Sequence, residues 1–165
     1  MHLETHRLQI VPLTARQLRL WTEDISALEK ELNCLYKAEP MDEELKLTVQ
    51  WQICLIDDDD NEYSLFETFW FIIRKSDRAV VGSACFKGCP DKNNEVEIGY
   101  GLNSGFERNG YMTETVKAMC RWALENPDVL HVTAETEINN HASQNVLQRC
   151  GFTMTTKSLI CTWRL

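Results

Sequence analysis

The sequence lacks the features that mark membrane, secreted and nucleic-acid-binding proteins. Its 165 residues contain no apolar run near the roughly 18 residues of a membrane-spanning helix. The first residues, MHLETHRLQIVPL, do not show the basic and then apolar order of a signal peptide, so we expect a cytoplasmic protein without membrane contact. The formal net charge of −8 argues against DNA or RNA held by phosphate contacts.

The sequence also lacks the spacings that predict disulfides or metal sites. Its seven cysteines are an odd number without a Cys-x-x-Cys pair, and Cys85 and Cys89, which are four residues apart, suit zinc poorly. The acidic run Asp57–Asp60 does not continue as a calcium loop, because Glu62 replaces the required glycine and Thr68 the required glutamate. We therefore expect free thiols in a reducing cytoplasm, a solvated loop and no metal.

The patterning that is present predicts one α/β (α+β) domain over residues 1–165. The order of its elements is β-α-α-β-β-β-α-β-α-β-β, without repeats or a linker. Strands are predicted over 3–12, 68–74, 79–87, 95–102, 129–137 and twice within 152–165, and helices over 14–33, 42–56, 112–125 and 140–150.

The negative charge is concentrated in the first half of the chain. Residues 1–80 hold 9 Lys and Arg against 16 Asp and Glu, whereas residues 81–165 hold 8 against 9. Either this is an ordinary solvated surface, or it is a face that attracts a cationic substrate.

A strand, two glycine turns and a helix follow one another in EVEIGYGLNSGFERNGYMTE. The backbone N–H groups of residues 108–113 have no helical partners there, so the turn at Gly110 can bind an anion. It is neither a Walker loop, which requires GK[ST], nor a GxGxxG dinucleotide motif. In the second segment, EINNHASQNVLQRCGF, Asn139 or Asn140 is expected to cap a helix that Gly151 ends, which leaves Ser143 without a structural explanation.

Together these segments resemble the GNAT superfamily of acetyl-CoA-dependent N-acetyltransferases. The family's pyrophosphate loop, Gln/Arg-x-x-Gly-x-Gly/Ala, corresponds to residues 107–112, followed by Thr113 and Glu114. Residues 98–100 (IGY) and the pattern formed by Asn140, Ser143, Gly151 and Phe152 look like the branch of ribosomal-protein N-terminal acetyltransferases. The resemblance implies a mixed, mostly antiparallel twisted sheet flanked by helices, with a homodimer as one possible assembly.

The resemblance also implies the residues of the site. Acetyl-CoA and an amine, either a small molecule or a protein N-terminus, would react by direct attack. A backbone N–H near residues 98–100 would stabilise the oxyanion, while Asn140 would bind the pantetheine arm and Ser143 would lie near its sulfur as a catalytic residue. The implied cofactor-binding residues are Ile98, Tyr100, Arg108, Asn109, Gly110, Tyr111, Met112, Thr113, Asn140 and Ser143.

Glu97 is the candidate general base because it lies in the strand that lines the family's acetyl site. Glu95 shares its face and is interpreted as an ordinary strand residue. His131 and His141 stand at the start of a strand and of a helix and are weaker candidates. Neutralising a lysine amine at pH 7 costs about 4.6 kcal/mol against about 1 for an α-amine, so a single base favours amines of low pKa.

Three positions depart from the family pattern. Glu107 and Met112 replace Gln/Arg and a small residue, and Leu147 stands where many members carry a tyrosine acid. Two alternatives therefore stay open: a GNAT-fold module that binds CoA with little turnover, and an acidic protein-interaction domain. The acceptor pocket is expected from the first two helices and the last hairpin, which contain Trp21, Trp51 and Lys157, although core packing explains the tryptophans equally well.

Overall fold

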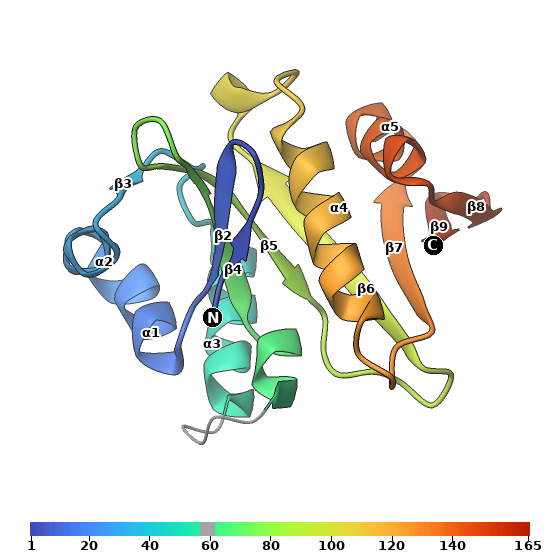
Figure 1. Cartoon of the computed structure of the whole chain (residues 1–165), viewed down its shortest axis with the longest axis horizontal. Helices are drawn as coiled ribbons and strands as arrows, with labels where there is room; N and C mark the ends of the chain where they lie inside the picture. Colours follow the sequence, from blue (N-terminus) through green and yellow to red (C-terminus); the bar gives the residue numbers. More distant parts are fainter. Residues whose placement is uncertain (57–61) are drawn as a thin grey trace.

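One mixed sheet organises the chain (Figure 1). The computed structural model describes residues 1–56 and 62–165, and the predicted loop Asp57–Asp60 lies outside them. Within these residues the strands are β1 (Leu3–Glu4), β2 (Leu8–Pro12), β3 (Leu35–Tyr36), β4 (Phe69–Arg74), β5 (Ala79–Phe86), β6 (Glu95–Leu102), β7 (His131–Glu137), β8 (Thr153–Thr156) and β9 (Ile160–Arg164). Their order is β1-β2-β4-β5-β6-β7-β9-β8, with β3 beside β5. Only β3–β5 and β6–β7 are parallel among the described strands, which confirms the predicted, mostly antiparallel sheet.

Helices cover both faces of this sheet. The α-helices are α1 (Ala15–Glu23), α2 (Ile25–Leu32), α3 (Glu43–Leu55), α4 (Tyr111–Leu124) and α5 (His141–Cys150), and the short 3-10 helices are η1 (Glu62–Phe66) and η2 (Ser104–Phe106). One buried cluster joins the sheet to α4 and α5, and a second joins it to α1, α2 and α3. None of the described helices is both long and apolar enough to cross a membrane.

Two predicted elements are divided in the structure. The helix expected over 14–33 begins at the Thr14 cap but is broken at Asp24, whose side chain caps α2 by accepting a hydrogen bond from the Ala27 N–H. The strand expected over 3–12 is a β1–β2 hairpin, because the chain turns where the Thr5 N–H bonds to the Leu8 carbonyl oxygen. The Thr5 hydroxyl also accepts a hydrogen bond from the Leu8 N–H, so at both places a short polar side chain bonds to the nearby backbone and overrides the apolar periodicity.

The parallel pair β6–β7 separates part of the way along its length. Its register runs from Glu95–His131 to Glu97–Thr133 and then ends, although β6 continues to Leu102 and β7 to Glu137. Beyond Glu97 the two strands therefore diverge and leave a wedge-shaped gap in the sheet. The first turn of α4 and the start of α5 lie at this gap (Figure 1).

Candidate active site

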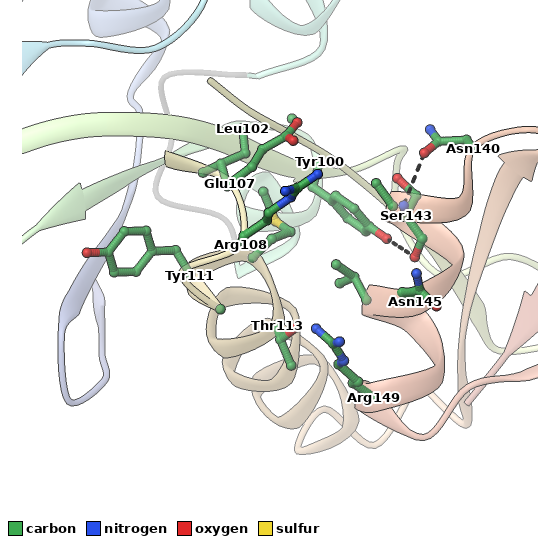
Figure 2. A pocket seen from close by; sticks show the side chains of 15 residues that line it. Tyr100, Leu102, Glu107, Arg108, Tyr111, Thr113, Asn140, Ser143, Asn145 and Arg149 are labelled. Atoms are coloured by element: carbon green, nitrogen blue, oxygen red, sulfur yellow. Dashed lines mark hydrogen bonds between the residues drawn. The ribbon is translucent and has the colours of Figure 1, made fainter. Parts of the chain in front are cut away.

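A cavity of about 520 Å³ occupies the space between the end of β6, the start of α4 and one face of α5 (Figure 2). This volume is within the usual range for small-molecule sites. The cavity brings together eight of the residues expected from the sequence, although they come from segments far apart in the chain. It is lined by Tyr100, Gly101, Leu102, Glu107, Arg108, Gly110, Tyr111, Met112, Thr113, Asn140, Ala142, Ser143, Asn145, Val146 and Arg149.

The turn before α4 presents backbone amides to this cavity. Arg108 and Gly110 both have left-handed backbones, with φ of 60° and 78°, and the first helical bond of α4 runs from the Glu114 N–H to the Gly110 carbonyl oxygen. Among the described residues, no group accepts a hydrogen bond from the N–H groups of residues 108–113. The Met112 side chain is buried in the core, so it does not cover them. This positive helix end suits a diphosphate.

Two guanidinium groups reinforce the positive potential of the cavity. Figure 2 shows Arg108 directed into the cavity and Arg149 extending from α5 toward α4. Neither makes an ion pair within the described part of the chain. The carboxylate of Glu107 is directed away from the first turn of α4, which keeps its negative charge apart from the free amides (Figure 2).

Arg149 lines the cavity but was not among the residues expected from the sequence, although the helical spacing of its neighbours indicates its position. Ala142, Val146 and Arg149 follow one another at helical spacing, and all three line the cavity. A 3.6-residue period that starts at Ala142, the residue before Ser143, reaches Val146 and then Arg149 on one face of the helix.

Two polar contacts fix the start of α5 at the cavity. The Asn140 side-chain oxygen accepts a hydrogen bond from the Ser143 N–H at 3.1 Å, which confirms an asparagine cap. The Tyr100 hydroxyl donates to the Ser143 carbonyl oxygen at 3.2 Å. Burial raises the pKa of Tyr100 to about 12, and this hydrogen bond only partly offsets the effect of burial, so the hydroxyl stays protonated near neutral pH.

The backbone of Tyr100 faces the gap between β6 and β7. The Lys87 N–H bonds to the Glu97 carbonyl oxygen, so the alternation of an antiparallel ladder directs the backbone groups of Glu97, Gly99 and Gly101 toward β5. The groups of Tyr100 consequently point the other way, where pairing with β7 has ended. The Tyr100 N–H therefore lies in the part of β6 where an oxyanion donor was expected.

Three expected cofactor residues have other surroundings. Ile98 is buried in the core. The Asn109 amide nitrogen bonds to the carbonyl oxygens of Phe106 and Glu107, so it supports the turn. Tyr111 is among the lining residues, but its ring points away from the cavity (Figure 2). The ring lies instead beside the guanidinium groups of Arg7 and Arg74.

Glu97 lies on the opposite face of β6 from Tyr100. Val96 and Ile98 are buried against the α4 side of the sheet, so the intervening Glu97 faces the other side, where its carboxylate makes an ion pair with Lys87. Glu95 shares that face and pairs with Arg164 at 2.5 Å. The cavity and the candidate base thus lie on two sides of one strand, next to the gap.

None of the remaining candidates is among the residues that line the cavity. His131 and His141 begin β7 and α5, as expected. Leu147 is fully buried in the core, and Trp21 is also buried, whereas Trp51 is 66% exposed, so core packing accounts for Trp21 alone. Within residues 1–56 and 62–165, no group of three or more His, Cys, Asp or Glu side chains is arranged to hold a metal ion.

The chain is similar to several acetyltransferases. It matches the family described as "Acetyltransferase (GNAT) domain" over residues 7–153. An uncharacterized N-acetyltransferase of Bacillus subtilis, YjdG, is 37% identical over 89 residues, which are 54% of this chain and 53% of that protein. The chain thus spans about half the length of this curated relative.

Solved structures agree on the fold. RimL, a ribosomal L7/L12 alpha-N-protein acetyltransferase in complex with coenzyme A, superposes with a TM-score of 0.69 at 16% identity, over 100% of this chain and 97% of the other. The microcin C7 self-immunity acetyltransferase MccE, in complex with acetyl-CoA and AMP, gives 0.63 at 16% identity, over 98% and 93%. Because the family match covers most of the chain and the sheet agrees with these folds, the protein belongs to the GNAT acetyltransferase family.

Proposed function

We propose that this protein transfers the acetyl group of acetyl-CoA to a primary amine. The observation that carries the proposal is the cavity itself, which joins the free amides before α4 to the gap between β6 and β7. A diphosphate at the amides and a thioester in the gap are the two ends that one extended acetyl-CoA molecule would require.

The proposed binding mode uses groups that line the cavity. The amides of residues 108–113, with Arg108 and Arg149, would hold the diphosphate. Asn140 and the exposed turn around Ser143 would face the pantetheine arm, because both line the cavity between α5 and β6. The thioester would then reach the Tyr100 backbone, whose N–H can stabilise the oxyanion that develops during attack.

The chemistry requires a neutral amine, a stabilised oxyanion and a leaving thiolate. The amine nitrogen forms a bond to the thioester carbon, the carbon–sulfur bond breaks, and the proton lost by the amine passes to the Glu97 carboxylate. A thiol of pKa about 8.5 leaves readily as the thiolate, so the reaction does not depend on a tyrosine at position 147. Ser143 remains the candidate hydroxyl near the sulfur.

The acceptor would approach from the face that carries Glu97. Because Glu97 and the cavity lie on opposite faces of β6, the amine and acetyl-CoA would meet through the gap from two sides. The acidic first half of the chain favours a cationic acceptor, and RimL is named as an alpha-N-protein acetyltransferase. We therefore propose peptide N-termini or small cationic amines as acceptors.

The first experiment measures binding of the donor. Acetyl-CoA at 100 times its Kd should add about 2.7 kcal/mol to the free energy of unfolding, which a thermal shift detects easily. No shift at millimolar acetyl-CoA would contradict the proposal and favour the acidic interaction domain.

The second experiment measures turnover with a panel of amines. Thiol release from acetyl-CoA is followed with peptides bearing free α-amines, with N-terminally blocked peptides bearing lysine, and with small polyamines. We expect release with α-amines or small amines in preference to lysine side chains. Binding without release for every amine would instead support a CoA-binding module, and a preference for lysine would contradict the proposed acceptor class.

A further inference from the structure

Arg7 connects the N-terminal hairpin to the first turn of α4. It lies in the turn between β1 and β2, and its backbone N–H and its Nε donate to the two Glu114 carboxylate oxygens at 2.9 and 2.8 Å. Its NH2 nitrogen lies 2.7 Å from Glu114 Oε2, and the Thr5 hydroxyl donates to Oε1 at 2.5 Å. The two partners are 107 residues apart in the sequence.

The same guanidinium supports the turn before α4 from outside the cavity. Its NH1 donates to the Asn109 carbonyl oxygen at 2.8 Å, and its central carbon lies 4.7 Å above the Tyr111 ring. A Cβ atom at Gly110 would lie 3.4 Å from its NH2 nitrogen. Arg7 therefore contacts Asn109 and Tyr111, the residues on either side of Gly110, but does not line the cavity.

These contacts have two consequences for an anion at the turn. Arg108 is a non-glycine residue with a left-handed backbone, a conformation that costs about 1 kcal/mol. Contacts from outside the turn are therefore needed to stabilise it. The Glu114 carboxylate would repel a diphosphate at the same helix end, but Arg7 neutralises it. Burial favours a raised pKa of Glu114, yet the hydrogen bonds from Thr5 and Arg7 outweigh it and hold that pKa below its usual value.

We propose that Arg7 is a positioning residue for acetyl-CoA. Through Asn109 and Glu114 it holds the turn in the conformation that directs the amides of residues 108–113 into the cavity, and it screens the nearby carboxylate. This inference rests on the proposed function. It predicts that Arg7 matters for donors that carry a diphosphate and has little effect on the acetyl transfer step itself.

The test compares Arg7→Gln, Arg7→Lys and Glu114→Gln with the wild type. Arg16→Gln is the matched control, because Arg16 makes an exposed ion pair with Glu31 on the opposite side of the sheet from α4. We expect the Arg7 variants to raise the KM for acetyl-CoA and the calorimetric Kd for CoA about tenfold, with kcat at saturating donor and the KM for the amine unchanged. Arg7→Lys should recover little, because lysine cannot span Glu114 and Asn109 together.

A donor without the diphosphate separates positioning from general damage to the fold. With S-acetylpantetheine, kcat/KM should be the same in Arg7→Gln and in the wild type. Equal loss with both donors, or a CoA Kd within twofold of the wild type in the folded Arg7 variants, would overturn the inference. If Arg7→Gln fails to fold, Arg7→Lys carries the same comparison.

The two proposals fail in distinguishable ways. A wild-type protein that neither binds CoA nor releases its thiol contradicts the proposed function, and the inference falls with it. A wild-type protein that is active, with Arg7 variants that bind CoA normally, contradicts the inference alone.

Discussion

The Tyr100 hydroxyl donates a hydrogen bond to the Ser143 carbonyl oxygen at 3.2 Å, across the opening between β6 and α5. This hydrogen bond joins β6, which is expected to hold the acetyl group, to α5, which is expected to hold the pantetheine arm. Because the pKa of Tyr100 is raised to about 12 by burial, the contact should persist at every pH at which the protein is handled.

Tyr100→Phe should lower the free energy of unfolding by about 1 kcal/mol, because a half-buried carbonyl loses its donor. Because the pKa of Tyr100 is raised in the folded protein, this stabilisation is complete at pH values below about 10, the pKa of tyrosine in the unfolded chain. It is lost only as the pH rises through the folded-state pKa of about 12. The difference in Tm between variant and wild type should therefore stay constant from pH 6 to 9. A difference that disappears within this range would contradict the assignment.

Gly110→Ala should destabilise the protein by about 1–2 kcal/mol and weaken CoA binding, because a side chain is strained at a positive φ. The new Cβ would also lie close to the Arg7 guanidinium. Gly99→Ala is the control, since Gly99 does not line the cavity, a Cβ there would meet no atom closer than 3.6 Å and the backbone φ is not positive. Equal effects of the two substitutions, in chemical unfolding and in calorimetry, would refute the strained-turn explanation.

Arg149→Gln should raise the KM for acetyl-CoA about three- to tenfold, because a charge-assisted bond to phosphate is lost at a partly exposed site. The dependence of this KM on salt should become weaker, since one fewer cation is screened. Arg19→Gln, an exposed arginine on α1, provides the control. An unchanged KM and salt dependence would remove Arg149 from the donor site.

Glu97→Gln should lower kcat about a hundredfold near pH 7, within the usual range for loss of a general base. The deficit should shrink as the pH approaches the pKa of the amine, because a larger fraction of the acceptor is then already neutral. Glu95→Gln is the control, because Glu95 carries the same charge as Glu97 and lies on the same face of β6. It should leave kcat nearly unchanged. A pH profile of Glu97→Gln parallel to that of the wild type would exclude Glu97 as the base.

Leu147→Tyr should not introduce an acid. Leu147 is fully buried, so a larger side chain with a hydroxyl should cost about 1–3 kcal/mol of stability through overpacking. We expect a lower Tm and no gain in turnover. A variant that is as stable as the wild type and faster in thiol release would show that position 147 can reach the cavity.

Local chemistry made much of the fold and part of the candidate site predictable. The Asn140 cap, the turn at Gly110 and the strands β4 and β5 depend on hydrogen bonds and sterics among residues close in sequence. The same local chemistry explains the misplaced elements, because Asp24 and the turn at Thr5 divide segments whose apolar periodicity is continuous.

The main helices and strands, the caps and the turn at Gly110 could therefore be predicted from the amino-acid pattern, since each depends on neighbours along the chain. The alternation of side chains along a strand already separates Glu97 and Tyr100 onto opposite faces of β6. The tertiary structure alone places a gap beside them, because the divergence of β6 and β7 is a property of two strands packed in one sheet. It also decided that Arg7 meets Glu114, because sheet order and helix packing bring together side chains that no local pattern connects.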